Sequence, residues 1–220
     1  MEKLLRTEKE KKPFLFGFLF LVFGYILLSW LNNKFVLTSE LYYFSLSNSI
    51  SRENINELFI LKTRWEWVNF IFTPVFLILK AFFISIVLYV GIILFEHKTK
   101  FSKLFKIAIT AEYVFLFSGV IKFCWIYFFR TSIDLNYFGF FQPLSAINFF
   151  APSDNLSFLI YPLQLINLFE LAYFVILANL LMSVINKSFW ESFEFVLSTY
   201  GLSLVIWVVF ITFLTLNFGV

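Results

Sequence analysis

Five apolar segments, each long enough to cross a lipid bilayer as a helix, dominate this chain of 220 residues. A spanning helix needs about 20 mostly apolar residues, and such lengths occur at residues 13–31, 67–95, 104–129, 158–184 and 193–216. Only 14% of the residues are charged and 60% are hydrophobic, whereas soluble domains have roughly 25% and 45–50%. The pattern predicts an all-α integral membrane protein with five transmembrane helices.

Basic residues are unevenly distributed between these segments, and their distribution predicts the orientation in the membrane. A tail at residues 1–12 holds five of them, and the loops that follow Phe95 and Val184 are also basic. The segment 130–157 holds one arginine and no lysine. Because cytoplasmic loops are enriched in Lys and Arg, we predict an N-in, C-out protein of the inner (cytoplasmic) membrane.

The first span and the two outer segments each have a distinct pattern. The basic tail and span 13–31 lack a small-residue cleavage site, which favours an uncleaved signal anchor over a cleaved signal peptide. The outer segment 32–66 becomes amphipathic after Ser51, a predicted cap, and this predicts a short helix on the outer membrane surface. The aromatic, proline-containing segment 130–157 is predicted to fold back onto the helices; a docking surface for another protein is the alternative.

Two stretches, "EHKTKFSKLFK" and "INKSFWES", share a pattern that predicts an internal repeat. When one residue is skipped in the alignment, Lys98 aligns with Lys187 and Thr99 aligns with Ser188. A hydroxyl residue therefore follows the lysine in both stretches. Each stretch is a tight turn followed by an apolar helix. Residues 67–129 and 158–217 are therefore predicted to be two copies of one helical hairpin. Both copies start and return outside, which makes them parallel repeats about an axis along the membrane normal.

The stretch Leu163–Leu202 combines an aromatic-rich helix, a short basic turn and a helix start that contains Tyr and Gly. Together with the earlier stretch "EHKTKFSKLFKIAITAEY", it resembles the Yip1-domain family of membrane proteins over about residues 69–213. The resemblance implies two tight cytoplasmic hairpins and a non-enzymatic adaptor or transporter without catalytic residues. Eukaryotic members carry a soluble N-terminal region where this chain has a further span, so their trafficking and GTPase-binding roles are not carried over.

Two charged residues lie near the centres of predicted spans, at matching positions of the two hairpins. They are Lys80 in "FLILKAFF" and Glu170 in "NLFELAYF". A charge at mid-bilayer costs about 2.5–3.5 kcal/mol on insertion scales, so we expect these two side chains to form an ion pair. Such a pair specifies helix register more than it adds stability. Three interpretations stay open: a pairing lock, a substrate or proton site, and contact with a partner subunit.

Four further polar residues are secondary candidates: Glu112, Asn167, Lys106 and Glu194. Glu112 lies about two turns into the third span; it is an alternative acceptor for the lysine of the second span, or it faces a cytoplasmic vestibule. Asn167 lies one turn before the acidic residue of the fourth span, where an amide usually forms an interhelical hydrogen bond; a ligand contact is the alternative. Lys106 and Glu194 are matched by the repeat at the cytoplasmic face and are candidates for a second ion pair, weakened by water.

No motif in the sequence marks a nucleotide-binding, zinc-protease or serine-hydrolase site. The single His97 and single Cys124 exclude a zinc site of the usual kind and an internal disulfide. We expect no enzyme activity, cofactor, metal or nucleic-acid partner, and weak contact of the basic tail with anionic lipid. These features favour a non-enzymatic accessory or scaffold subunit of a larger inner-membrane protein complex. A small transporter or channel that uses Lys80 and Glu170 is the alternative.

Overall fold

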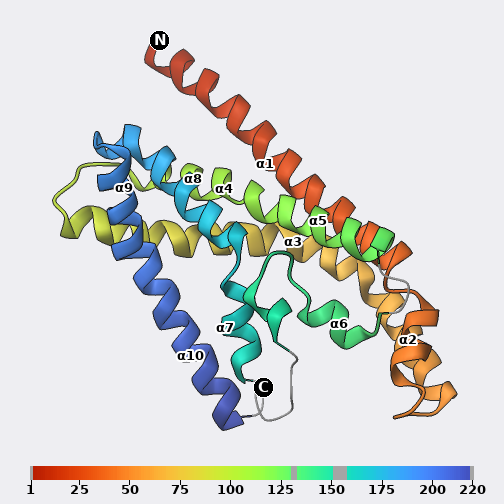
Figure 1. Ribbon diagram of the computed structural model, residues 1–220. Helices are drawn as coiled ribbons and strands as arrows, with labels where there is room; N and C mark the ends of the chain where they lie inside the picture. The colour runs from red at the N-terminus through yellow and green to blue at the C-terminus, as the bar shows by residue number, and fades with distance from the viewer. Residues whose placement is uncertain (1, 130–132, 151–157, 219–220) are drawn as a thin grey trace. The chain divides into compact units, whose positions relative to one another are not determined.

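Helices make up almost all of the structure, a computed structural model that describes residues 2–129, 133–150 and 158–218 (Figure 1). For residues 2–12 only the backbone is described. The elements in chain order are α1 (Glu2–Phe35), α2 (Ser39–Leu46), α3 (Arg52–Leu94), α4 (Phe101–Ala111), α5 (Tyr113–Phe129), α6 (Leu135–Phe140), η1 (Ala146–Phe149), α7 (Ile160–Leu165), α8 (Leu168–Ile185), α9 (Phe189–Val196), the π-helix η3 (Leu197–Gly201) and α10 (Leu202–Phe218). The described residues contain no β-strand, so the prediction of an all-helical fold is confirmed.

Among the described residues, five helical stretches are long and apolar enough to cross a membrane. They are Pro13–Phe35, Arg52–Leu94, Phe101–Phe129, Leu168–Ile185 and Phe189–Asn217. Each overlaps one of the five predicted segments, and the chain is therefore a multi-pass membrane protein. The boundaries differ most in the second stretch, which begins earlier than predicted, and in the fourth, which begins later.

Helix α3 is one unbroken element of 43 residues, so the predicted boundary between a surface helix and the second span does not occur (Figure 1). Its start is capped as predicted, because the Ser51 hydroxyl accepts from the Asn54 N–H at 3.4 Å. No Gly or Pro precedes Pro74, which lies inside the helix without ending it. A helix of this length extends about 65 Å, roughly twice the hydrocarbon thickness of a bilayer. Part of α3 must therefore lie outside the hydrocarbon.

The described chain divides into two compact units. The first unit contains Met1–Tyr25, Thr73–Leu116 and Leu171–Ile206, and the second contains Ile26–Phe72, Phe117–Glu170 and Trp207–Val220. The first unit holds the turns of both predicted hairpins, and the second holds the segments predicted to lie outside. The long helices α1 and α3 contribute residues to both units.

Both helices that lead into a hairpin turn, α3 and α8, end with the same backbone arrangement. A residue in the left-handed conformation follows each helix, Glu96 with φ of 56° and Asn186 with φ of 54°. The next N–H bonds to the carbonyl five residues earlier, at 2.9 Å from His97 and 3.3 Å from Lys187. This is the hydrogen bond of a Schellman cap, which satisfies carbonyls that the helix end leaves free.

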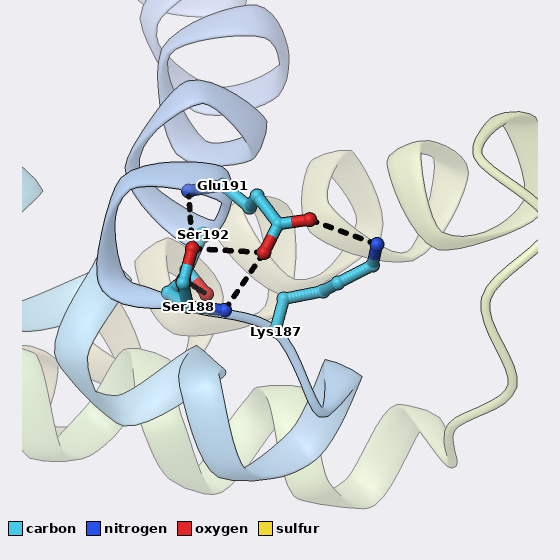
Figure 2. A network of polar contacts seen from close by, with 4 residues as sticks. All are labelled: Lys187, Ser188, Glu191 and Ser192. Carbon is cyan, nitrogen blue, oxygen red and sulfur yellow. Dashed lines mark hydrogen bonds and ion pairs between the residues drawn. The ribbon is translucent and has the colours of Figure 1, made fainter.

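The turn before α9 is further fixed by a capping box, shown in Figure 2. The Ser188 hydroxyl accepts from the Glu191 N–H at 3.4 Å, and Glu191 Oε2 accepts from the Ser188 N–H at 2.9 Å. Lys187 Nζ lies 2.9 Å from Glu191 Oε1, and the Ser192 hydroxyl donates to the Ser188 carbonyl. The corresponding cap of α4, Lys100, has no side-chain hydrogen bond. Side chains therefore order the second turn more strongly than the first.

Gly91 allows α3 to approach α9 and η3 closely within the first unit. A β-carbon at Gly91 would overlap the methyl group of Thr199 and lie 2.9 Å from Phe195 Cζ. Phe195 also stacks edge-on against Phe95 and His97 around this contact, with ring centroids 5.6 and 6.1 Å away. The absence of a side chain at position 91 is thus what lets the two hairpins pack together here.

In the second unit, the described part of the predicted outer loop folds back onto helices, as expected. Three aromatic residues of α6 and its end, Tyr137, Phe138 and Phe141, pack against a buried cluster formed by Val36, Phe123 and Ile126. Gln142 Nε2 also donates to the Ser118 hydroxyl of α5 at 3.2 Å. Residues 130–132 and 151–157 of the predicted loop lie outside the described residues.

The predicted fourth span is divided into α7 and α8, because Asn167 caps α8. Its Oδ1 accepts from the Glu170 N–H at 2.8 Å, and its Nδ2 donates to the Gln164 carbonyl at 2.8 Å. Asparagine is among the residues that best satisfy the free N–H groups of a helix start. The described side-chain hydrogen bonds of Asn167 are therefore local, to the end of α7 and the first turn of α8, and the predicted interhelical hydrogen bond stays a prediction.

Candidate functional site

An ion pair between Lys80 and Glu112 is the most unusual polar feature of the first unit. Lys80 Nζ lies 2.9 Å from Glu112 Oε2. The Glu112 side chain is only 1% exposed, whereas the Lys80 side chain is 44% exposed. The second carboxylate oxygen, Oε1, is buried without a hydrogen-bond partner among the described residues. The acidic side chain of the pair is therefore buried, and the lysine side chain is about half exposed.

The local backbone at Glu112 explains how a carboxylate enters the interior of this unit. Glu112 is the single residue that separates α4 from α5, and its N–H is shared between the Ala108 and Ile109 carbonyls at 3.3 Å each. The Phe115 N–H then bonds to the Glu112 carbonyl, three residues earlier, at 3.1 Å. Such tightened turns inside a helix often mark functional or strained positions.

Two aromatic rings lie near the ammonium group of Lys80. Its Nζ lies 3.9 Å from the ring centroid of Phe115 and 5.8 Å from that of Tyr173. These two rings are 4.9 Å apart, and Tyr200 lies 5.3 Å beyond Tyr173. Cation–π contacts stabilise an ammonium by about 0.5–2 kcal/mol, with the larger values in desolvated sites. The rings thus compensate part of the cost of holding Lys80 away from water.

A second helix irregularity lies next to this aromatic group. Tyr200 belongs to the π-helix η3, which interrupts α9 and α10. Glu112 follows the first residue of α4 by the same number of residues as Tyr200 follows the first residue of α9. The two irregular turns therefore occur at the same distance from a helix start. Gly201 of η3 packs against Phe174, where an added β-carbon would lie 3.0 Å from the ring. Both irregular turns therefore place a functional-group side chain toward the interior of the first unit.

The other residues predicted from the sequence, Glu170, Lys106 and Glu194, lie on three different helices, α8, α4 and α9. Glu170 lies in the first turn of α8 and is 6% exposed. It belongs to the second unit, and its predicted contact with Lys80 stays a prediction. Lys106 Nζ lies 5.4 Å from the ring centroid of Phe14, and the ion pairs of the described residues do not include one between Lys106 and Glu194. Within the described part of the chain, no cluster of three acidic, His or Cys residues is placed to hold a metal ion.

Sequence reasoning named Glu112 only as an alternative partner of Lys80 and missed the aromatic rings. One signal was available for them. Phe115 follows Glu112 by three residues and Tyr173 follows Glu170 by three residues, so each acidic residue has an aromatic neighbour on the same helical face.

Comparison with known proteins adds no relative. No protein-family model matches the chain, and neither a curated protein nor a solved structure shows significant similarity to it. The resemblance to Yip1-domain proteins therefore stays a prediction. The groups of the site are a half-exposed lysine side chain, a buried carboxylate with one oxygen that has no hydrogen-bond partner among the described residues, and an aromatic lining.

Proposed function

We propose that this chain is a non-enzymatic accessory or scaffold subunit of a larger protein complex in the inner (cytoplasmic) membrane. The observation that carries the proposal is the Lys80 side chain, which is 44% exposed and is the only charged side chain between Glu66 and Glu96 in the sequence. A charge exposed to hydrocarbon costs about 2.5–3.5 kcal/mol or more. Contact with a second protein removes that exposure, whereas contact with lipid does not.

The proposed subunit has an N-in, C-out orientation, with a signal anchor followed by two parallel hairpin repeats. The positions of the basic residues support this orientation. The shared Schellman caps at Glu96 and Asn186 support the repeat, and Lys80 and Glu170 are equally far along the chain from these two residues. Single cysteines introduced into a Cys124→Ser variant at Lys98, Lys187 and Ser45 test the topology. A membrane-impermeant thiol reagent should label Ser45→Cys in intact cells and label the other two only after lysis.

Purification of the tagged full-length protein in mild detergent tests the accessory function. We expect a membrane protein to co-purify in a fixed ratio with the wild type, and to be lost from Lys80→Met. Lys122→Met is a suitable control, because Lys122 is another lysine of a span and lies over the Phe138 ring of the second unit. A monodisperse free monomer with no co-purifying chain would contradict the proposal.

A small transporter or channel is the second candidate, and it is favoured by Glu112 Oε1, which has no hydrogen-bond partner among the described residues and lies beside two irregular helix turns. Such turns and buried ionisable groups recur along substrate and ion pathways. Reconstituted vesicles loaded with an ion-sensitive dye provide the test. Flux that is present in the wild type and abolished in Lys80→Ala, Glu112→Gln or Glu170→Ala would support transport; equal flux in empty vesicles and in vesicles with wild-type protein would contradict it.

A further inference from the structure

The two hairpin turns of the first unit differ in charge. Residues 95–110 contain four lysines and one glutamate, whereas residues 186–198 contain one lysine and two glutamates. The lysine of the second turn, Lys187, is paired with Glu191 at 2.9 Å (Figure 2). The ion pairs of the described residues include none of the four lysines of the first turn. The first turn therefore has an excess of positive charge that no described ion pair balances.

Two of these lysines, Lys103 and Lys106, lie on the outward side of α4. The helix buries Leu104 and Ile107 on its other side. Lys103 is exposed and Lys106 is partly exposed, and residues three apart are neighbours on a helix surface. Lys106 Nζ also lies 5.4 Å from the ring centroid of Phe14 in α1. Helix α4 thus presents two ammonium groups, one turn apart, beside α1.

Two contacts of Tyr113 hold α1 in place beside these lysines. The Tyr113 hydroxyl donates to the Gly17 carbonyl at 2.6 Å, and its ring stacks on Phe20 with centroids 6.3 Å apart. Gly17 follows Phe14 by three residues, so the two lie on neighbouring turns of one face of α1. The contact between Lys106 and Phe14 is therefore part of the packing of α1 against α4 and α5.

The depth of the two lysines follows from the span to which they belong. They lie near the start of the spanning stretch Phe101–Phe129, and Phe14 lies at the start of the stretch Pro13–Phe35. A helix of 29 residues is about 43 Å long, close to the roughly 40–45 Å of a bilayer with its headgroup layers. The first turn of α4 therefore lies in a headgroup layer, and the flexible stem of Lys106 reaches the same layer.

We propose that Lys103 and Lys106 of α4, beside Phe14 of α1, form a binding site for the headgroup of an anionic phospholipid. The lipid phosphate accepts hydrogen bonds from the two ammonium groups. The acyl chains lie along α1, where the apolar side chains of Phe16 and Leu19 are exposed. The site differs from the basic tail at residues 1–12, and it does not depend on the accessory function.

Charge favours an anionic lipid over a zwitterionic one. In phosphatidylcholine the choline group balances the phosphate, so this headgroup leaves the charge of the two lysines uncompensated. Phosphatidylglycerol has no such internal cation. Lysines near an anionic leaflet are each attracted to it, and a leaflet can supply an anion to every lysine of the turn.

A second copy of the chain matches the first turn less well than a leaflet does. Its second turn lies near the start of another span and has two carboxylates to offer, Glu191 and Glu194. Glu191 is already bound to Lys187 and to the Ser188 hydroxyl. Glu194 is exposed, but one carboxylate does not balance a turn with four lysines and one glutamate.

Native mass spectrometry of the full-length protein in detergent micelles tests the inference. Phosphatidylglycerol and phosphatidylcholine are added in separate titrations, and the lipid-bound species give a dissociation constant for each. We expect Lys103→Gln and Lys106→Gln each to weaken phosphatidylglycerol binding about fivefold, the contribution of one lysine near an anionic surface. The double variant should weaken it about 25-fold, to a value close to that for phosphatidylcholine.

Two controls separate the site from the overall charge of the protein. Lys187→Gln removes the same charge from the second turn and should leave the affinity for phosphatidylglycerol unchanged. Lys103→Arg/Lys106→Arg keeps both charges and should retain the preference for phosphatidylglycerol. Circular dichroism verifies that each variant is folded.

Each contrary outcome decides a different point. Equal affinity of the wild type for the two lipids overturns the inference. A phosphatidylglycerol preference that survives in Lys103→Gln/Lys106→Gln overturns the role of these two lysines. Displacement of the lipid by an equal concentration of inorganic phosphate overturns a lipid as the occupant. A dimer that is present without lipid and lost in Glu194→Gln overturns it in favour of a second copy.

Discussion

Each of the two hairpins has, in its part that belongs to the first unit, a Lys–Glu ion pair with a nitrogen–oxygen distance of 2.9 Å, but the two pairs lie in opposite environments. Lys187 and Glu191 are both about half exposed at the turn of the second hairpin, with side-chain exposures of 43% and 49%. Lys80 and Glu112 join the two helices of the first hairpin, and Glu112 is 1% exposed. Equal geometry therefore does not imply an equal role.

The contrast shows how each hairpin is ordered. The second hairpin has a capping box and a short turn, so water-exposed hydrogen bonds fix its tip. The first hairpin has a longer turn and an uncapped helix start, and its distinctive polar contact lies in the interior. A buried pair adds little net stability, because desolvation offsets attraction, yet it specifies which groups must meet. The first hairpin therefore has its distinctive polar contact in the interior, and the second has it at the exposed turn.

The largest expected effect comes from removing the lysine of each pair in turn. Lys80→Met leaves the Glu112 carboxylate buried and unpaired, so the free energy of unfolding should fall by about 3–5 kcal/mol. Lys187→Met should cause no measurable change, because its partner remains hydrated. Unfolding in mixed detergent micelles, followed by tryptophan fluorescence, measures both. Equal losses for the two variants would remove the proposed difference between the pairs.

A smaller effect is expected where the hairpins touch. Gly91→Ala puts a methyl group onto the Thr199 side chain and should lower the free energy of unfolding by about 1–3 kcal/mol. Thr199→Ser removes the methyl group and keeps the hydroxyl that donates to the Phe195 carbonyl at 2.7 Å. The double variant should therefore recover part of the loss in the same assay, because the added methyl group still lies against the Phe195 ring. No recovery would show that the contact at Gly91 is not what limits packing.

The smallest expected effect separates the two turns. Ser188→Ala removes the capping hydroxyl of α9 and should cost about 1 kcal/mol. Thr99, which aligns with Ser188 in the sequence, caps no helix, and its hydroxyl is without a described partner. Thr99→Ala should therefore be neutral or slightly stabilising. Hydrogen exchange of the amides in the first turn of α9 and of α4 reports each cap, and a larger effect at Thr99 would reverse the assignment of the ordered turn.

The sequence predicted the elements that depend on composition and local pattern. The five spans, the Ser51 cap and the return of the aromatic loop onto helices follow from apolar length, capping preference and the cost of exposed rings. The boundaries were less predictable. Residues 52–66 are amphipathic both as a separate surface helix and as the start of α3, and nothing in their pattern distinguishes the two.

The candidate site was only half predicted, because its geometry depends on helix irregularities. Lys80 stands out in an apolar run, but the choice of partner depends on where α4 ends. No Gly or Pro marks the turn at Glu112 in the sequence. No Gly or Pro precedes Gly201 in the π-helix that contains Tyr200. Tertiary packing produces these turns, and a single sequence does not encode them as a local signal.

Double-mutant cycles for the unfolding free energy test most directly whether Glu112 is the partner of Lys80. One cycle combines Lys80→Met with Glu112→Gln, and the other combines it with Glu170→Gln, the partner predicted from the sequence. Residues in contact give coupling energies of about 0.5–3 kcal/mol, whereas distant residues are additive. We predict a coupling above about 1 kcal/mol with Glu112 and a smaller one with Glu170. Additive effects for Glu112, or a larger coupling with Glu170, would contradict the assignment of the site.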